Sequence, residues 1–279
     1  MERKSRKTRI AVCLLLATLS LGLSVYAAKE VNKYWVHDET RPLPTVVIPG
    51  EKPGEPPSDA IVLFDGENAS GLVHDSGGKL TWHINKDDGY IVIPPKKEKA
   101  GGMRTEKSFG NCQLHIEWAS PEVIEGSGQG RGNSGIYFMG KYEVQVLDSW
   151  TDNNYKNNKT YADGLAATIY GQHPPLVNVC RKPGEWQSYD IVFLRPIFDG
   201  DKVVRKARVT VLHNGAAVHN NLEIEGASAH KTVAKYKYHP DKLPISFQNH
   251  GNPVRYRNIW VRELAEEPYL IKGPTPVKE

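Results

Sequence analysis

The chain has 279 residues but only three cysteines and three methionines. So few cysteines exclude the disulfide framework of small secreted domains, and no cysteine or histidine cluster has the spacing of a structural zinc site. Cys112 alternates with Leu114, Ile116 and Trp118, which predicts a buried free thiol. Pairing of Cys112 with Cys180 in an oxidising compartment is the alternative.

Helical periodicity is also missing. No segment carries an apolar stripe of helical period over about eleven residues or more. The 19 prolines and 25 glycines instead predict many turns and few long helices.

The one long apolar run, residues 10–25, is shorter than the roughly 20 residues of a membrane-spanning helix. Five basic residues precede it, and Val25 and Ala27 place small residues at the −3 and −1 positions of a cleavage site. This arrangement predicts a secretory signal peptide over residues 1–27, with an uncleaved anchor as the alternative. We therefore expect an exported protein, periplasmic or secreted, without a stable membrane span after cleavage.

The remaining chain has no excess charge of either sign. The whole sequence has 36 basic and 32 acidic residues, a net charge of +4. Removing residues 1–27 takes away five basic residues and one acidic residue, which leaves 31 of each. A neutral domain argues against a nucleic-acid partner and suits a neutral ligand such as a sugar.

Residues 28–59 form a proline-rich extension. Six prolines lie between positions 42 and 57, so this stretch cannot hold a helix or a central strand. It is expected to be extended chain, either a spacer or a strap laid on the domain. Trp35 and the apolar residues 46–48 favour the strap.

Short strands separated by turns fill residues 60–264, and residues 265–279 form a C-terminal tail. Asp87-Asp88-Gly89, Gly140-Lys141 and Asn214-Gly215 are hairpin turns. The expected strands are 61–64, 80–84, 90–93, 112–118, 136–138, 142–147, 189–194, 207–212, 216–218, 245–248 and 258–263. This pattern predicts a single all-β domain, a sandwich or a barrel.

The strand beginning at Tyr142 has a polar face. Glu143 and Gln145 share one side with Leu147, while the other side is apolar. Two polar groups on a strand otherwise built for burial suggest the lining of a cleft, and a merely solvated face is the alternative. The preceding glycine-rich loop, 126–132, lacks a phosphate-binding lysine. It either carries Arg131 over a polar ligand or is simply a long connection.

A second polar face lies at the end of the strand that contains Ser246. Gln248 and His250 share this face, and His250 precedes a glycine turn. The histidine is either functional or structural. A long insertion between strands supplies further side chains that could wall a pocket, namely Tyr161, Tyr170, Gln172, His173 and Trp186.

These groups argue against two familiar hydrolytic mechanisms. A standard glycosidase needs two carboxyls, whereas Gln145 follows Glu143 on the same face. No Gly-x-Ser-x-Gly elbow of a serine hydrolase is present. One carboxylate with a histidine and amide donors instead suits removal of a proton beside a carbonyl, or general-base attack by water.

At these positions the sequence resembles the 3-keto-disaccharide hydrolase domain family, over about residues 60–264. The matching motifs are Leu63-Phe64-Asp65-Gly66, Asn133-Ser134-Gly135-Ile136-Tyr137, Tyr142-Glu143-Val144-Gln145-Val146-Leu147-Asp148, Ile169-Tyr170-Gly171, Gly184-Glu185-Trp186, His213-Asn214-Gly215 and the run from Gln248 to Ile259. The resemblance implies a concanavalin-like or laminin-G-like β-sandwich (jelly roll). It also implies export from a carbohydrate-degrading bacterium.

The resemblance further implies action on glycosides whose C3 hydroxyl has become a ketone. Glu143 or His250 would remove the C2 proton, the enolate would expel the C1 substituent, and water could then add. Candidates to bind the sugar or steady the enolate are Gln145, Gln248, Arg131, Asn133, Tyr137, Tyr170 and Arg257. A divalent cation could assist, with ligands that the sequence does not identify.

Two positions depart from the family pattern. Met139 stands where many members have arginine, and Asn249 where many have aspartate. These departures indicate one of three things: a subgroup of the family in which the loss of a positive and of a negative group compensate each other, altered use of substrate or metal, or lost activity. A carbohydrate-binding, lectin-like module without catalysis is therefore the main alternative to an enzyme, followed by a conventional glycan hydrolase. The sequence carries no indication of the oligomeric state.

Overall fold

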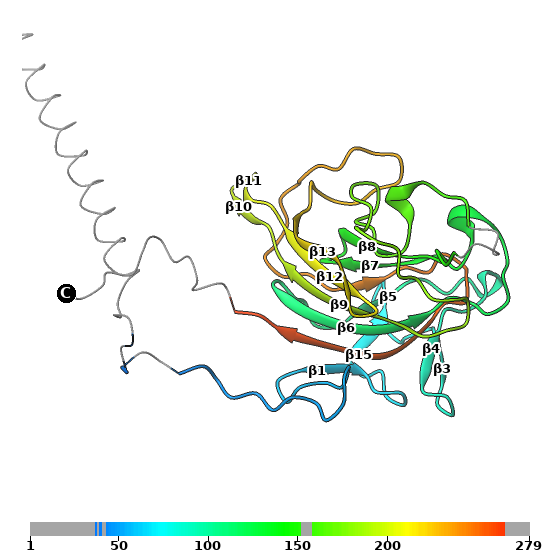
Figure 1. The fold of residues 1–279 in the computed structure, drawn as a ribbon, viewed down its shortest axis with the longest axis horizontal. Coiled ribbons are helices and arrows are strands. Elements are labelled where there is room, and N and C mark those ends of the chain that lie inside the picture. The colour runs from blue at the N-terminus through cyan, green and yellow to red at the C-terminus, as the bar shows by residue number, and fades with distance from the viewer. Residues whose placement is uncertain (1–36, 38, 41–42, 152–157, 266–279) are drawn as a thin grey trace, which may run out of the picture. The chain divides into compact units, whose positions relative to one another are not determined.

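Antiparallel strands make up almost all of the regular structure (Figure 1). The computed structural model describes residues 37, 39–40, 43–151 and 158–265. The expected signal peptide and almost all of the C-terminal tail lie outside these residues. Val47–Leu264 forms one compact unit.

The larger sheet has eight strands, in the order β13-β12-β9-β6-β15-β4-β3, with β1 also paired to the long strand β15. Its strands are β1 (Ile61–Phe64), β3 (His83–Asn85), β4 (Tyr90–Val92), β6 (Cys112–Ala119), β9 (Gln187–Leu194), β12 (Arg208–His213), β13 (Ala216–Glu223) and β15 (Arg255–Glu263). In its central strand β6, apolar and polar residues alternate from Cys112 to Trp118, as the sequence predicts. In the neighbouring strand β9, buried and half-buried side chains alternate although four consecutive residues are apolar.

The smaller sheet has five strands in the order β2-β5-β14-β7-β8. They are β2 (Leu72–His74), β5 (Met103–Thr105), β7 (Ser134–Phe138), β8 (Tyr142–Val146) and β14 (Ser246–Phe247). A separate hairpin joins β10 (Ile197–Asp199) to β11 (Lys202–Arg205). Three single turns of 3₁₀ helix complete the described elements, η1 (Lys96–Glu98), η2 (Gly128–Gly130) and η3 (Ala162–Gly164).

The two sheets pack face to face around one apolar core. Phe138 of the smaller sheet stacks on Phe193 of the larger one, with ring centroids 4.7 Å apart. Phe247 and Tyr256 meet across the same interface at 6.0 Å. All four side chains are essentially inaccessible to solvent. The predicted β-sandwich is therefore confirmed, and its jelly-roll layers bury their apolar faces against each other.

The predicted hairpins form, with one change in a turn. Asn214 and Gly215 both have positive φ, as a type I′ turn requires. Between β7 and β8 the positive-φ pair is Met139 and Gly140 instead of Gly140 and Lys141. The buried Met139 side chain joins the core from this turn.

Cys112 is buried and both described cysteines are free, so the thiol prediction is confirmed for Cys112. The strands β2, β5, β10 and β11 were not predicted, because each has only three or four residues and too little alternation to be recognised.

Residues 48–58 run along the larger sheet. The backbone N–H of Ser58 donates to Ile48 O at 2.9 Å, which closes this segment into a loop. At its far end, Gly54 O accepts hydrogen bonds from Trp260 Nε1 at 2.8 Å and Asn258 Nδ2 at 2.9 Å. These contacts make this part of the proline-rich extension a strap on the sheet.

Candidate functional site

The outward face of the smaller sheet forms the floor of a cavity. Alternation sends one set of side chains into the core and the other set outward. In β7 and β8 the outward residues Tyr137 and Glu143 are directly paired, as are Gly135 and Gln145. Strand β14 lies on the other side of β7 and continues into Gln248. Three strands thus bring their polar faces together.

Glu143 is the carboxylate of this floor, and only 3% of the residue is exposed. Burial raises its pKa to about 7, although a hydrogen bond from Tyr137 acts in the opposite direction. A carboxyl group with this pKa exists in both protonation states near neutral pH. It can therefore accept a proton and release it again.

Gly135 provides the space that the Glu143 carboxyl occupies. A Cβ atom at Gly135 would lie 2.2 Å from Glu143 Oε1 and 3.0 Å from Tyr137 Cε2. No other residue type fits here without moving one of these side chains. The glycine of the Asn-Ser-Gly-Ile-Tyr motif is thus required by the position of the acid.

Amide groups surround Glu143 on one side. The Gln129 amide NH₂ donates to Thr160 Oγ1 at 2.8 Å and to Gly164 O at 2.9 Å, which directs its oxygen toward Gln145. The Gln145 amide lies 2.8 Å from that oxygen. With its NH₂ turned to the other side, it donates instead to Ser134 O at 2.7 Å and to Glu143 Oε1 at 3.1 Å. The Gln145 amide therefore donates either to the glycine-rich loop or to the acid, depending on its orientation.

Asn133 is buried at the edge of the same group. Its side-chain NH₂ donates to Gln129 O at 2.6 Å. Its oxygen Oδ1 is buried without a partner among the described residues. A buried acceptor of this kind is free to take a hydrogen bond from a ligand hydroxyl.

The glycine-rich loop is held by a buried ion pair. Arg131 Nε lies 2.6 Å from Asp148 Oδ2, and both side chains are less than 10% exposed. Asn158 also joins this loop, accepting from Gly128 N at 2.6 Å and donating to Gly128 O at 2.9 Å. Arg131 thus lies outside the cavity and supports the loop that carries Gln129.

Gln248 and His250 approach the floor from the end of β14. Gln248 Nε2 donates to the Tyr137 hydroxyl at 3.3 Å. His250 lies at the mouth, where partial burial lowers the pKa of its ring against the effect of a hydrogen bond with Asn252. Its ring is therefore neutral at pH 7.

Asn249, between these two residues, points elsewhere. Its side-chain NH₂ donates to Ala100 O, and its Oδ1 accepts from Gly251 N at 2.8 Å. Neither Asn249 nor Met139, the two departures from the family pattern, lines the cavity.

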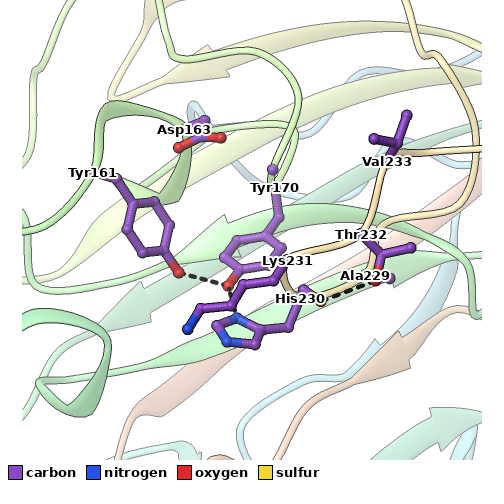
Figure 2. Close-up of a pocket in the computed structure, with 9 residues that line it drawn as sticks. Tyr161, Asp163, Tyr170, Ala229, His230, Lys231, Thr232 and Val233 are labelled. Atoms are coloured by element: carbon purple, nitrogen blue, oxygen red, sulfur yellow. Dashed lines mark hydrogen bonds between the residues drawn. The ribbon is translucent and has the colours of Figure 1, made fainter.

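The far wall comes from the long insertion and from the loop around residue 230. The Tyr170 hydroxyl lies 2.6 Å from the Tyr161 hydroxyl and 3.0 Å from His230 Nδ1 (Figure 2). His230 and Gln129 were not predicted from the sequence. His230 lies in a loop without periodicity, so no local pattern marks it. Gln129 lies in the glycine-rich loop, of which only Arg131 was predicted to reach a ligand.

The complete cavity has a volume of about 370 Å³, within the range of small-molecule sites. It is lined by Gln129, Asn133, Tyr137, Glu143, Gln145, Tyr170, Ala229, His230, Gln248 and His250. The predicted acid and histidine therefore converge on one cavity, together with every predicted binding residue except the two arginines.

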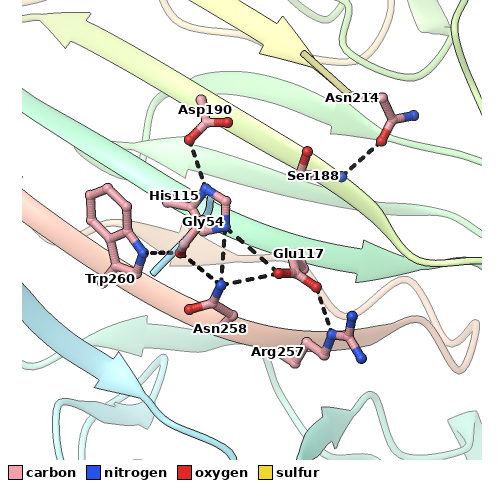
Figure 3. Close-up of polar contacts among 9 residues, drawn as sticks. All are labelled: Gly54, His115, Glu117, Ser188, Asp190, Asn214, Arg257, Asn258 and Trp260. Atoms are coloured by element: carbon pink, nitrogen blue, oxygen red, sulfur yellow. Dashed lines mark hydrogen bonds and ion pairs between the residues drawn. The ribbon is translucent and has the colours of Figure 1, made fainter. Parts of the chain in front are cut away.

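Arg257 lies on the opposite side of the sandwich, on the outer face of the larger sheet (Figure 3). Its Nε is 2.6 Å from Glu117 Oε2, and its guanidinium lies 4.2 Å from the Trp186 ring centroid. The neighbouring His115 contacts Asp190 at 2.7 Å. The structure thus places Arg257 and Trp186 in a network away from the cavity.

A divalent cation would find few ligands here. Within residues 43–151 and 158–265, no three His, Cys, Asp or Glu side chains are grouped closely enough to hold a metal ion. The cavity itself offers one carboxylate, two histidines and neutral amides. This donor set does not match the all-oxygen shell of magnesium or calcium.

None of the helices among the described residues is long and apolar enough to cross a membrane.

Comparison with known proteins supports the family resemblance. No curated protein matches the chain. A solved structure from Parabacteroides distasonis ATCC 8503, named a "putative glycosyl hydrolase", is 40% identical, with a TM-score of 0.74. The match covers 82% of this chain and 97% of that one. A second structure from the same organism, with the same name, is 20% identical over 74% of this chain and 94% of its own, with a TM-score of 0.53, and shares the fold.

The family model of the 3-keto-alpha-glucoside-1,2-lyase-like domain matches residues 59–262, which include the whole sandwich and the cavity. The predicted family is thereby confirmed. The chain belongs to the 3-keto-alpha-glucoside-1,2-lyase-like domain family, a carbohydrate-active family.

Proposed function

We propose that the cavity binds a glycoside carrying a ketone at C3 and breaks its glycosidic bond by elimination. The observation that carries this proposal is Glu143, a buried carboxyl with a pKa of about 7 on the floor of a sugar-sized cavity. A single base of this strength suits a C–H bond that a neighbouring carbonyl has made acidic. The family description supports the same substrate class.

The reaction begins when the Glu143 carboxylate takes the proton from C2. The electron pair of the C2–H bond forms the C2=C3 double bond, and the ketone oxygen becomes an enolate. When the enolate collapses, C1=C2 forms, the C1–O bond breaks, and the departing oxygen takes up a proton. Glu143 returns the proton it removed, so the elimination is balanced. Addition of water across C1=C2 would convert the product to a free 3-keto sugar.

The enolate needs hydrogen-bond donors near the ketone oxygen. Two donors of the floor are Tyr137, which hydrogen-bonds to Glu143, and Gln248, which donates to the Tyr137 hydroxyl. Burial, and secondarily the charge of Glu143, raises the pKa of Tyr137, so its hydroxyl stays protonated at every pH of interest. Both groups therefore remain neutral donors while the negative charge develops.

His250 is the second candidate for the base. Its ring is neutral at pH 7, but it lies at the mouth, whereas Glu143 lies at the floor. The deep position of Glu143 in the cavity and the pKa of its carboxyl both favour Glu143 as the base that removes the C2 proton. The convergence of an acid and a histidine on one cavity supports an enzyme over a lectin-like module, which would need only a shallow binding face.

Export belongs to the same proposal. A cleaved signal peptide over residues 1–27 would place the domain in the periplasm or outside a bacterial cell, where glycosides are encountered.

The test compares 3-keto glucosides with the same glucosides unoxidised, with and without a chelator. We expect turnover of the 3-keto substrates alone, with release of the C1 substituent. The absence of product from every 3-keto substrate would refute the proposal. Loss of turnover with chelator would show that a cation takes part.

Three variants assign the roles. Glu143→Gln should lower turnover at least about 100-fold, because the amide cannot take a proton. His250→Ala should lower it comparably only if the histidine shares the proton transfer. The exposed Glu67→Gln is the matched control and should retain full activity. An unchanged rate in Glu143→Gln would remove Glu143 from the mechanism.

A further inference from the structure

The backbone of Glu143 is hydrogen-bonded to two segments of the far wall. Its N–H donates to Ser228 Oγ at 3.2 Å, and its carbonyl oxygen accepts from Tyr170 N at 3.2 Å. Ser228 belongs to the loop that carries His230, and both Tyr170 and His230 line the cavity. The strand that carries the proposed base thus also positions the wall opposite it.

The loop that carries His230 is closed at its base. Gly226, with φ of 149°, packs so closely on Lys235 that a Cβ would lie 2.4 Å from Lys235 C. Ala227 N donates to Lys235 O at 3.2 Å. Closing a loop in this way removes conformations that an open loop could adopt, so the place of His230 at the cavity is restricted.

Tyr170 is the centre of a chain of three polar side chains (Figure 2). Its hydroxyl lies 2.6 Å from the Tyr161 hydroxyl and 3.0 Å from His230 Nδ1. A tyrosine hydroxyl can accept hydrogen bonds and also donate one. Tyr161 and His230 can both donate to it, which leaves the proton of Tyr170 free for a ligand in the cavity.

Tyr170 holds this proton firmly. Burial, the hydrogen bond with Tyr161 and the charge of Glu143 all raise the pKa of its hydroxyl. The effect of Glu143 also means that the two groups lie near each other. An oxygen that leaves a carbon atom as an alkoxide is a stronger base than a tyrosinate, so it can take the proton from Tyr170.

Few other groups could supply a proton at this place. Among the described residues that line the cavity, those besides Glu143 with an acidic O–H or N–H are Tyr137, Tyr170, His230 and His250. Tyr137 is hydrogen-bonded to Glu143. Partial burial keeps the ring of His250 neutral at the mouth, which makes it a poor acid. Tyr170, with His230 beside it, is therefore the best placed donor.

His230 connects Tyr170 to solvent. The residue is exposed, and together with Tyr170 it also borders a second cavity of about 380 Å³. An imidazole ring can give up a proton at one nitrogen and take another at the second nitrogen. It can therefore pass a proton from water to the Tyr170 oxygen.

We propose that Tyr170 is the acid that protonates the departing oxygen, and that His230 resupplies its proton from solvent. The inference rests on the proposed elimination and names the donor that this reaction needs. As the C1–O bond breaks, its electron pair stays on the oxygen, which takes the hydroxyl proton of Tyr170. The tyrosinate then takes a proton from His230 Nδ1, and His230 Nε2 takes one from water. Glu143 releases the C2 proton to solvent, so the protons balance.

The experiment compares two 3-keto glucosides of the same anomer in Tyr170→Phe, which loses only the hydroxyl. Methoxide is a poor leaving group and needs a proton, whereas 4-nitrophenolate leaves as a stable anion. For the methyl glycoside we expect kcat/KM to fall about 100-fold or more, the usual contribution of a general acid. For the 4-nitrophenyl glycoside, corrected for its uncatalysed reaction, kcat/KM should stay within about threefold.

Exchange of the C2 hydrogen separates the acid from the base. In deuterated water, Tyr170→Phe should still exchange C2–H of the methyl 3-keto-glucoside faster than buffer alone, because Glu143 is intact, although methanol is no longer released. NMR follows both processes in one sample. Glu143→Gln should lose the exchange and the release together. A merely structural defect in Tyr170→Phe would also lower both.

Two further variants test the supply of the proton. His230→Ala should lower methanol release, and imidazole added to the solution should restore part of it, because the ring site is open to solvent. Tyr238→Phe removes the hydroxyl of another tyrosine, which is 55% exposed and lines neither cavity. This control should change neither substrate.

The wild type distinguishes failure of this inference from failure of the elimination. A wild-type protein that releases neither methanol nor 4-nitrophenol from the 3-keto substrates refutes both proposals. An active wild type, combined with equal losses on the two substrates or no loss in Tyr170→Phe, overturns the role of Tyr170 alone. Full activity of His230→Ala, or a loss that imidazole does not restore, overturns the role of His230.

Discussion

The Tyr137 hydroxyl and the Glu143 carboxyl interact across a directly opposed pair of residues on β7 and β8. The register of one hairpin therefore sets the distance between the proposed base and its hydrogen-bond donor. Burial of the carboxyl and the tyrosine hydrogen bond change the pKa of Glu143 in opposite directions, with burial the larger effect. Activity, pH dependence and stability are thereby linked through a single carboxyl group.

The pH dependence of kcat/KM should show the interaction between Tyr137 and Glu143. If the ionised Glu143 is the base, kcat/KM rises with pH through about 7, where the carboxyl loses its proton. In Tyr137→Phe the stabilising hydrogen bond to the carboxylate is lost, so the pKa of Glu143 rises and the inflection moves to higher pH. Rates of both proteins from pH 5 to 9 measure this shift. An inflection that stays in place or moves down would contradict the role of the pair.

Stability should show the cost of burying Glu143 in its ionised form. The pKa of this carboxyl is about 7 in the folded protein and 4.5 in the unfolded chain, so the folded state holds the proton more tightly. The contribution of the neutral carboxyl to the free energy of unfolding is complete below pH 4.5 and is lost as the pH rises to 7. At about 1.4 kcal/mol per pKa unit the loss is on the order of 3 kcal/mol.

Glu143→Gln cannot ionise, so it should avoid this loss. Its stability relative to the wild type should increase between pH 4.5 and pH 8, by up to about 3 kcal/mol. Denaturant unfolding of both proteins at the two pH values gives the difference directly. A relative stability that does not change with pH would mean that Glu143 is ionised at little cost in the folded state.

Gly135→Ala tests the space beneath the acid. The added methyl group would lie 2.2 Å from Glu143 Oε1, so the carboxyl must leave its position on the floor. We expect a loss of turnover of about 100-fold, since small displacements of a catalytic group are costly. Gly130→Ala is the control, because a Cβ there meets nothing within 4 Å. Equal activity of the two variants would show that the position of the carboxyl is not limiting.

Local sequence pattern predicts the parts of this fold that repeat regularly. In β6 apolar and polar residues alternate from Cys112 to Trp118, so the core face of this strand is evident from sequence. The same period of two places Glu143 and Gln145 on one face of β8. Gln248 and His250 lie beyond the end of β14 and line the cavity from a segment that is not a strand. Short strands such as β2 and β5 have too few residues for alternation to be recognised, and only their partners in the sheet define them.

Long-range pairing accounts for what sequence analysis misses at the site. Arg131 and Arg257 look like ligand-binding residues in isolation, yet each has a carboxylate partner. Asp148 is 17 residues from Arg131, and Glu117 is 140 residues from Arg257. His230 reaches the cavity because Gly226 and Lys235 close its loop. Such contacts depend on the complete fold, and no local period of the chain encodes them.

The network beneath the strap provides a last prediction. Burial alone would lower the pKa of His115, but its contacts with Asp190 and Glu117 outweigh that effect and raise the pKa to about 9. A raised histidine pKa contributes stability that is complete below pH 6.5 and is lost as pH rises through 9. Asp190→Asn should therefore destabilise the protein by about 1–3 kcal/mol at pH 6 and by clearly less at pH 9.5.

The exposed Asp199→Asn is the control and should show no such dependence on pH. Thermal unfolding at the two pH values checks this, and an equal loss at both would indicate that His115 is neutral beneath the strap.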